Sequence, residues 1–260
     1  MDFSKIELFL LDMDGTIYLD HDLIDGSLDF INALIATKKK YIFMTNNSSK
    51  SKKAYLDKLN FLKIPCQEEN IFTSGMAMGI YLNTNYPDKT VYFLGTKSLE
   101  EELKSYHITL VEDNPDIVVV GYDRELTYHK LEKACQFLDD GAIFLATNCD
   151  LVCPIANHRY VPDCGSICHM LTTATKKTPT YIGKPSPYMI HILSQKTGIK
   201  VENIVVIGDR IYTDIMAGYN AKTMTICVLS GESTQATIDE SPIKPDYVVN
   251  SIKDLIKFLK

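Results

Sequence analysis

Two aspartates stand where an apolar stretch of the sequence ends, in the segment LFLLDMDGTIY at residues 8–18. Continuous apolar runs of this length are typical of parallel strands that are covered on both faces, and ligands of open α/β sheets bind beyond the carboxyl ends of such strands. Asp12 and Asp14 are therefore placed where carboxylates could bind a metal ion or transfer protons. Asp and Gly are also ordinary turn formers after a strand, so this segment alone leaves a simple turn open.

Further polar clusters follow apolar segments in the same way. In chain order they are Thr45 with Asn46 and Asn47, then Lys184, then Asp209 with Asp214. Taken singly, the first is also typical of a capped Asn/Ser loop, and a lone lysine is more often a solvated surface residue. Taken together, carboxylates and a backbone carbonyl form a hard oxygen site suited to Mg²⁺. The hydroxyl, amide and ammonium groups supply the donors that a phosphoryl group needs.

The apolar periodicity predicts the elements that would position these clusters. We expect strands at residues 6–11, 41–44, 69–75, 91–95, 117–121, 142–147, 204–207, 224–229 and 247–249, and helices at 28–35, 54–59, 99–106, 128–139, 187–198 and around 216–219. Residues 151–180 are poor in helical periodicity, so we expect loops and a hairpin around a pocket there. The phrase SIKD at 251–254 predicts a capping box at the start of a closing helix.

Composition and charge narrow the classes of protein. The chain has 260 residues, 45% of them hydrophobic and 23% charged, as in an ordinary globular protein. Its net charge of -6 argues against a nucleic-acid partner. The N-terminal segment resembles neither a secretory signal nor a transit peptide, and no apolar run approaches the roughly 18 residues of a membrane span. We therefore expect a cytoplasmic protein without a membrane partner.

Four of the seven cysteines lie close together in the sequence. Within twenty residues stand Cys149, Cys153, Cys164 and Cys168, accompanied by His158 and His169. A zinc site is conceivable, but the spacing is C-x3-C rather than the tighter C-x2-C of zinc knuckles. Because cysteines outside disulfide-rich secreted proteins are usually buried thiols, packing is the simpler interpretation.

The polar clusters together resemble the haloacid dehalogenase-like phosphatase superfamily in order, residue type and spacing. DMDGT, Thr45, Lys184 and GDRIYTD match its four motifs, and the phrases TNNSS, IFTSG and GKPSP fit its NagD-like and nitrophenylphosphatase-like branch over residues 6–232. The resemblance implies an α/β fold: a doubly wound, mostly parallel, Rossmann-like core at residues 1–76 and 179–260. A smaller α/β cap domain would be inserted at residues 77–178.

The resemblance also implies a phosphoric monoester hydrolase that uses Mg²⁺. Asp12 would be the nucleophile that forms an aspartyl-phosphate, and Asp14 the general acid and base. The metal shell would comprise Asp12, the backbone carbonyl of Asp14, Asp209, and Asp214 as a ligand or an orienting residue. The phosphate-binding set would comprise Thr45, Asn46, Asn47, which would brace the loop, and Lys184. Arg210 and Tyr18 match family positions and would have supporting roles.

Two other functions stay open at this stage. A phosphomutase or phosphotransferase would pass the aspartyl-phosphate to an alcohol, and a catalytically quiet binding protein would keep only the fold. The partner would be a small phosphate ester, such as a nucleotide monophosphate, a sugar phosphate, phosphoglycolate or pyridoxal phosphate. In the family the cap chooses the substrate, here through residues 148–166, where Asn-Cys-Asp replaces the branch's common Asn-Pro-Asp. Homodimers formed through the cap also occur in the branch.

Overall fold

The chain folds into two compact units. A computed structural model describes residues 1–155 and 159–259. The first unit consists of Met1–Thr45, Lys52–Phe72 and Lys184–Lys260, and the second of Asn46–Ser51 and Thr73–Gly183. Two of these junctions lie close to the sequence-based boundaries at residues 76 and 179, whereas the short segment Asn46–Ser51 joins the second unit. The role of the second unit as a substrate-specificity cap stays a prediction.

A six-stranded sheet forms the centre of the first unit. Its order is β15 (Tyr247–Val249), β14 (Met224–Val228), β13 (Ile204–Gly208), β1 (Leu8–Leu11), β4 (Lys40–Thr45) and β5 (Ile71–Thr73). The central strand β1 pairs in parallel with β4 on one side and with β13 on the other. All four residues of β1 are buried, as its apolar sequence predicts. The chain order reverses direction across the sheet at β1, which is where doubly wound sheets bind ligands.

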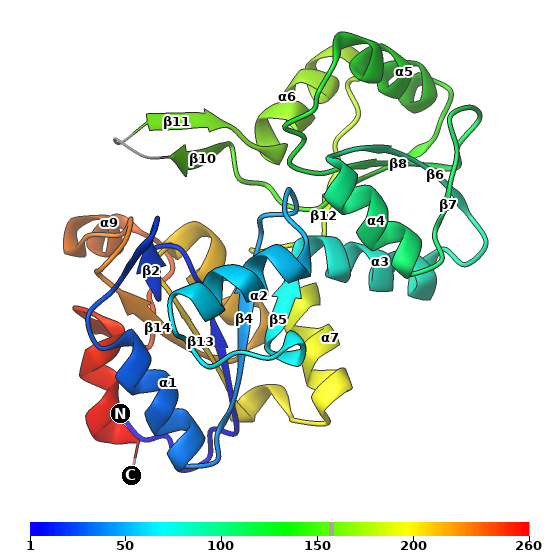
Figure 1. Cartoon of the computed structure of the whole chain (residues 1–260). Coiled ribbons are helices and arrows are strands. Elements are labelled where there is room, and N and C mark those ends of the chain that lie inside the picture. Colours follow the sequence, from blue (N-terminus) through cyan, green and yellow to red (C-terminus); the bar gives the residue numbers. More distant parts are fainter. Residues whose placement is uncertain (156–158, 260) are drawn as a thin grey trace. The chain divides into compact units, whose positions relative to one another are not determined.

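Helices cover this sheet and close its core. They are α1 (Ser27–Ala36), α2 (Lys52–Phe61), α7 (Tyr188–Thr197), α8 (Met216–Ala221) and α9 (Gln235–Glu240), with short 3-10 turns η1 (Glu68–Asn70) and η2 (Val201–Asn203), a π-helical turn η3 (Ile211–Ile215), and a terminal 3-10 helix η4 (Ile252–Phe258). Figure 1 shows α1 beside η4. Phe30 of α1 and Leu255 of η4 pack in one core cluster with Phe9 of β1. A small hairpin, β2 (Tyr18–Leu19) and β3 (Asp22–Leu23), follows β1.

The second unit has a parallel sheet of its own. The strand order is β12 (Thr180–Tyr181), β9 (Ile143–Ala146), β8 (Ile117–Val120), β6 (Thr90–Leu94) and β7 (Thr109–Leu110), and every neighbouring pair is parallel. Its helices are α3 (Ser74–Asn85), α4 (Lys97–Ser105), α5 (Tyr128–Asp139) and α6 (Cys164–Thr175). An antiparallel hairpin, β10 (Val152–Ile155) and β11 (Arg159–Pro162), precedes α6. The predicted α/β class is confirmed.

Several elements differ from the sequence-based expectations. Helix α9, the hairpin β2–β3 and the short strands β7 and β12 were not expected. Helix α3 is absent from these expectations because it is buried nearly all round and carries two glycines, so it lacks an amphipathic period. Helix α6 lies within residues 151–180, where loops and a hairpin were expected. Its buried residues do follow helical spacing, but two of them are the cysteines Cys164 and Cys168. The closing element η4 is a 3-10 helix, and Ser251 makes no side-chain cap hydrogen bond.

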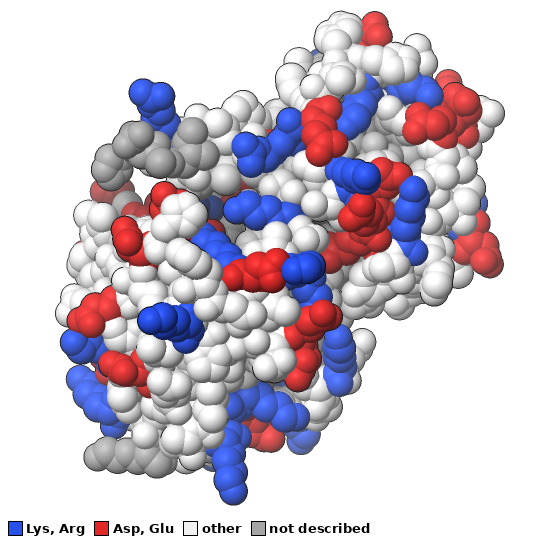
Figure 2. All heavy atoms as spheres, viewed as in Figure 1, with Lys and Arg blue, Asp and Glu red and all other residues white. Residues whose placement is uncertain are grey.

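The surface carries charges of both signs. On the face shown in Figure 2, Lys and Arg side chains are interspersed with Asp and Glu side chains on each unit. Within residues 1–155 and 159–259, no helix is long and apolar enough to cross a membrane.

The half-buried carboxylate of Asp116 holds the start of strand β6 in place, and it leads to a prediction about stability in acid. Asp116 accepts hydrogen bonds from Lys89 Nζ (2.8 Å), Thr90 N (2.9 Å) and Thr90 Oγ1 (3.0 Å). The bonds from Lys89 and Thr90 lower the pKa of Asp116 to about 2. Because the folded-state pKa lies below the unfolded value of about 3.9, the carboxylate stabilises the fold above about pH 4 and loses this effect as the pH falls.

We therefore expect Asp116→Asn to lower the urea midpoint at pH 7. The difference in urea midpoint between Asp116→Asn and the wild type should become smaller below about pH 4, because there the wild-type carboxyl group begins to be protonated in the unfolded chain. Urea unfolding at pH 7, 4 and 3 measures this. A difference that stays constant down to pH 3 would show that the charge of Asp116 does not stabilise the fold.

Candidate active site

Strand β1 places Asp12 and Asp14 at its carboxyl end, in the first unit. The backbone N–H of Asp12 still continues the sheet by donating to Ile207 O (2.9 Å). Beyond it the chain turns at Gly15, whose φ of +87° favours glycine. A Cβ at this position would also collide with the Asp209 carboxylate. The turn therefore brings the end of β1 against the residue that follows β13, as the strand-end pattern predicts.

Lys184 lies buried between two of the predicted carboxylates. Its Nζ donates to Asp12 Oδ1 (2.5 Å), to Asp214 Oδ1 (2.6 Å) and to the backbone oxygen of Met44 (3.2 Å). Burial lowers the pKa of this ammonium, but the charges of Asp12 and Asp214 outweigh burial and raise its pKa overall. Lys184 is therefore a permanent buried cation, which excludes the interpretation as a solvated surface lysine.

Three carboxylates gather around this one cation. Single oxygens of Asp12, Asp209 and Asp214 all lie within 4.8 Å of one another. Burial, and then the charge of Asp214, raise the pKa of Asp12 well above its usual range and that of Asp209 to about 7. The cluster thus brings more buried negative charge together than Lys184 can balance. Such a cluster favours binding of a further cation.

The two oxygens of Asp209 have different surroundings. Asp209 Oδ2 accepts a hydrogen bond from Glu232 N (2.7 Å). Asp209 Oδ1 is buried and has no hydrogen-bond partner among residues 1–155 and 159–259. By contrast, Asp214 uses both oxygens, since Oδ1 accepts from Lys184 and Oδ2 from the backbone N–H of Arg210 (3.1 Å). A buried acceptor without a donor is costly unless a ligand satisfies it.

The loop after β4 carries the predicted phosphate-binding residues. Thr45 ends the strand and is buried. The next residue, Asn46, belongs to the second unit, where its Nδ2 donates to Asp150 Oδ2 (2.7 Å) and its backbone oxygen accepts from Ser74 Oγ (2.5 Å). Asn47 Oδ1 accepts from both N and Oγ of Ser49 (2.9 and 2.8 Å). The side chain of Asn47 thus braces its own loop, and its contact with phosphate stays a prediction.

Several residues around the site were not predicted from the sequence. Lys58 Nζ lies 3.9 Å from Asp14 Oδ1 and 3.6 Å from the centre of the Tyr18 ring. Ser230 Oγ donates to the backbone oxygen of Gly15 (2.7 Å), and Glu232 pairs with Arg210 (3.0 Å). Ser230 and Glu232 follow β14, so the strand-end pattern could have found them. Lys58 lies on α2, and nothing in the local sequence indicates its contact with Asp14.

The cysteine group does not form a metal site in the part of the chain that the structure describes. The four cysteines are free thiols, and the Sγ atoms of Cys164 and Cys168 are 4.0 Å apart inside α6. Among residues 1–155 and 159–259, the group whose ligand atoms lie close enough to hold a metal is the aspartate cluster and not these cysteines. His158, which belongs to the zinc alternative, lies outside the described residues.

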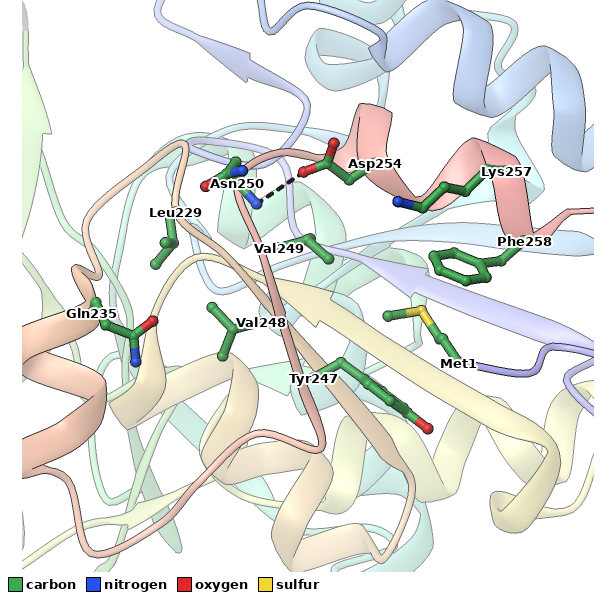
Figure 3. Close-up of a pocket in the computed structure, with 10 residues that line it drawn as sticks. All are labelled: Met1, Leu229, Gln235, Tyr247, Val248, Val249, Asn250, Asp254, Lys257 and Phe258. Carbon is green, nitrogen blue, oxygen red and sulfur yellow. Dashed lines mark hydrogen bonds between the residues drawn. The ribbon is translucent and has the colours of Figure 1, made fainter.

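A concave surface lies elsewhere in the first unit, at the edge strand β15. Figure 3 shows Tyr247 and Val249 of β15 together with Lys257 and Phe258 of η4 lining it. It contains none of the predicted site residues. It offers no carboxylate cluster and no buried lysine; both lie instead beside the polar ends of β1 and β13.

Comparisons with known proteins identify the family of the chain. A family model described as haloacid dehalogenase-like hydrolase matches residues 9–109, and a related HAD-hydrolase-like model matches residues 181–255. The chain is 33% identical to the 5'-nucleotidase YutF of Bacillus subtilis, over 96% of this chain and 98% of the relative. It is 32% identical to an acid sugar phosphatase of Staphylococcus saprophyticus, over 99% of both chains. A 4-nitrophenylphosphatase structure from Thermotoga maritima superposes with a TM-score of 0.95 at 37% identity, covering 99% of each chain.

Proposed function

We propose that this chain, which belongs to the haloacid dehalogenase-like hydrolases and is a phosphatase of their NagD-like and nitrophenylphosphatase-like branch, hydrolyses small phosphate monoesters. The reaction would pass through an aspartyl-phosphate on Asp12. The observation that carries the proposal is the group formed by the partly exposed Asp12 and the buried Lys184, Asp209 and Asp214. It combines a carboxylate nucleophile, an ammonium donor and a hard oxygen site beside one strand end, which is what phosphoryl transfer requires.

The residues fit Mg²⁺. The unsatisfied Asp209 Oδ1, the nearby Asp12 carboxylate and the backbone carbonyl of Asp14 are hard oxygen donors, and Mg²⁺ uses few protein carboxylates. We place Asp214 beside this shell as an orienting residue, because Lys184 and the backbone of Arg210 already occupy its two oxygens. When bound, the cation would screen the repulsion between the Asp12 carboxylate and the phosphoryl group.

Asp12 and Asp14 divide the chemistry. One oxygen of Asp12 attacks phosphorus and forms the acyl phosphate, while the bond from phosphorus to the ester oxygen breaks. The Asp14 carboxyl group gives its proton to that leaving oxygen, so the alcohol departs neutral. Asp14, now a carboxylate, takes a proton from water. The resulting hydroxide attacks phosphorus, phosphate leaves, and the carboxylate of Asp12 is regenerated.

Lys184 and Thr45 would hold the phosphoryl group in line with Asp12. An ammonium has three N–H donors, and in the structure they contact Asp12, Asp214 and the Met44 backbone oxygen. We propose that a phosphoryl oxygen takes the donor that now reaches Asp12, which frees that carboxylate oxygen for attack. The hydroxyl of Thr45 and the backbone at Asn46 would provide further donors.

The alternatives differ in their products. A phosphotransferase would yield a new phosphate ester when an alcohol acceptor is supplied, and a quiet binding protein would yield nothing. We expect free inorganic phosphate in a molar amount equal to the alcohol, over a panel of nucleotide monophosphates, sugar phosphates, phosphoglycolate and pyridoxal phosphate. Parallel assays of phosphate and alcohol measure this. A phosphate yield well below the alcohol yield would favour the phosphotransferase.

Metal removal is a separate test. We expect dialysis against EDTA to reduce phosphate release at least about 100-fold, because the buried carboxylates would then repel the substrate dianion. Added Mg²⁺ should restore the rate, and the cation is identified by comparing Mg²⁺, Mn²⁺ and Ca²⁺ at equal concentration. Full activity after exhaustive dialysis would contradict the proposed metal requirement. The circular dichroism spectrum, recorded before and after dialysis, serves as the control for folding.

A further inference from the structure

The second unit contains a cluster of buried polar side chains next to the phosphate-binding loop. Its members come from the segments 46–51 and 147–163 and are all less than one-tenth exposed. They are Asn46, Ser48, Thr147, Asn148, Asp150 and Asp163. Burying polar groups is costly unless each finds a partner, so such a cluster persists only when its hydrogen bonds are made.

Asp150 is the acceptor at the centre of this cluster. Its Oδ2 accepts from Asn46 Nδ2 (2.7 Å) and from Asn148 Nδ2 (2.9 Å). Asn148 Nδ2 also reaches Asp163 Oδ1 (3.2 Å), which caps α6 by accepting from Cys164 N (2.5 Å). Asp150 therefore connects Asn46 to the start of helix α6, through residues that lie about a hundred positions away in the sequence.

The cluster also fixes Gly183, the last residue of the second unit. Gly183 N donates to the backbone oxygen of Thr147 (2.8 Å). A Cβ on Gly183 would collide with this same oxygen and would lie 2.7 Å from Asn46 Oδ1. The carboxamide of Asn46 is therefore confined on both sides, by Asp150 at its nitrogen and by Gly183 at its oxygen. Ser74 Oγ holds the backbone oxygen of Asn46 as well.

Both confined residues are peptide-bonded to proposed phosphate-binding residues. Asn46 directly follows Thr45, and Gly183 directly precedes Lys184. A displacement of Asn46 or Gly183 is therefore transmitted through one peptide bond to a group that would hold the phosphoryl oxygens. Misplacing a binding group by about 1 Å is enough to cost up to roughly 100-fold in rate.

We propose that Asp150 is a positioning residue, which sets the place of the phosphate-binding loop by holding the Asn46 carboxamide. This inference rests on the proposed function, because it takes Thr45, Asn46 and Lys184 as the residues that hold the phosphoryl group. In this proposal the contact of Asp150 is with the Asn46 carboxamide and not with the phosphoryl group. Asp150 acts through Asn46, so its removal should affect phosphate binding more than any intrinsic step at Asp12.

The test compares two substitutions at this position. Asp150→Ala removes the acceptor, and we expect KM for 4-nitrophenyl phosphate and Ki for inorganic phosphate to rise about tenfold, with a smaller change in kcat. Asp150→Asn keeps an oxygen that can accept from both amides. It should therefore restore KM and Ki to within about threefold of the wild type. Equal KM and Ki in the wild type and Asp150→Ala would overturn the inference.

Asp116→Ala is the matched control for loss of stability. Asp116 also belongs to the second unit but precedes β8, whereas Thr147 and Asn148 follow β9. We expect this variant to lower the melting temperature without changing KM or Ki. A similar rise of KM in Asp116→Ala would show that general loosening of the unit explains the effect, and the inference would be wrong.

Two further measurements separate the possible failures. If Asp150→Ala does not fold, Asp150→Glu is measured in its place, because the longer side chain keeps a buried carboxylate but moves the acceptor by one methylene. Unchanged KM and Ki in Asp150→Glu would overturn the inference. Calorimetry with inorganic phosphate and Mg²⁺ measures binding without turnover. A wild type that neither binds phosphate nor releases it from esters would overturn the proposed function and this inference together. A wild type that does both, with unchanged Asp150 variants, would overturn the inference alone.

Discussion

Asp12→Asn should abolish turnover while leaving the fold intact. The amide cannot attack phosphorus as a carboxylate does, and loss of a catalytic nucleophile commonly reduces kcat by about 10⁴-fold or more. The fold should tolerate the change, because burial and the charge of Asp214 raise the pKa of Asp12 and so make its ionised form unfavourable in the folded protein. We expect the melting temperature without metal to stay the same or to rise.

Phosphate release from 4-nitrophenyl phosphate measures this effect, with circular dichroism as the check on folding. Asp22→Asn is a suitable control, because Asp22 is an exposed carboxylate of β3 in the same unit. It should keep the wild-type rate. Turnover by Asp12→Asn within about tenfold of the wild type would remove Asp12 from the nucleophile role.

Lys184→Met should produce the largest loss of stability among single changes at the site. The substitution leaves two carboxylates, Asp12 and Asp214, without the buried cation that both contact. Breaking a buried ion pair by removing one partner costs about 3–5 kcal/mol of unfolding free energy. Turnover should be lost as well, because the proposed phosphate donor is gone.

The stability loss should depend on pH. Burial is the largest cause that raises the pKa of Asp12, and Lys184 opposes it; without the ammonium the pKa of Asp12 rises further. A carboxyl group whose pKa is higher in the folded than in the unfolded state is less costly to bury at low pH, where it is protonated. In urea unfolding, Lys184→Met should therefore lose more unfolding free energy relative to the wild type at pH 8 than at pH 5.

Lys53→Met is the control for that measurement. Lys53 forms an exposed ion pair with Asp57, and such surface changes alter stability by no more than about 0.5 kcal/mol. A Lys184→Met variant as stable as Lys53→Met at both pH values would mean that the buried ion pairs contribute little. The assignment of Lys184 as the buried cation of the site would then be wrong.

The strand ends around the site could be predicted from local sequence. Residues 8–11 and 204–207 are uninterrupted apolar runs, and a fully buried parallel strand needs such a run. Their polar residues follow at once, and parallel strands place their carboxyl ends at the same edge of a sheet. For this reason the positions of Asp12, Asp209 and Asp214 in the sequence group them at one edge of the sheet. Lys184 instead follows β12, a strand of the second unit's sheet, so the strand-end argument does not place it there.

Other parts depend on contacts that no local pattern contains. The bond between Asn46 and Asp150 joins residues 104 positions apart, and it is one of the contacts that tie the segment Asn46–Ser51 to the second unit. Helix α3 is buried on almost every side, so its sequence lacks the polar stripe that marks a surface helix. Lys58 reaches Asp14 only because α2 packs on the core. Such features follow from tertiary packing rather than from spacing.

Trapping the covalent intermediate tests the central claim most directly. Borohydride reduces an acyl phosphate to an alcohol with release of phosphate, and would convert a phosphorylated Asp12 into homoserine. The wild type is mixed with substrate and Mg²⁺, quenched with borohydride during turnover, digested, and sequenced by mass spectrometry. We predict homoserine at position 12 only when substrate is present. Homoserine at another aspartate, or an unmodified position 12 in enzyme that is turning over, would contradict the proposed mechanism.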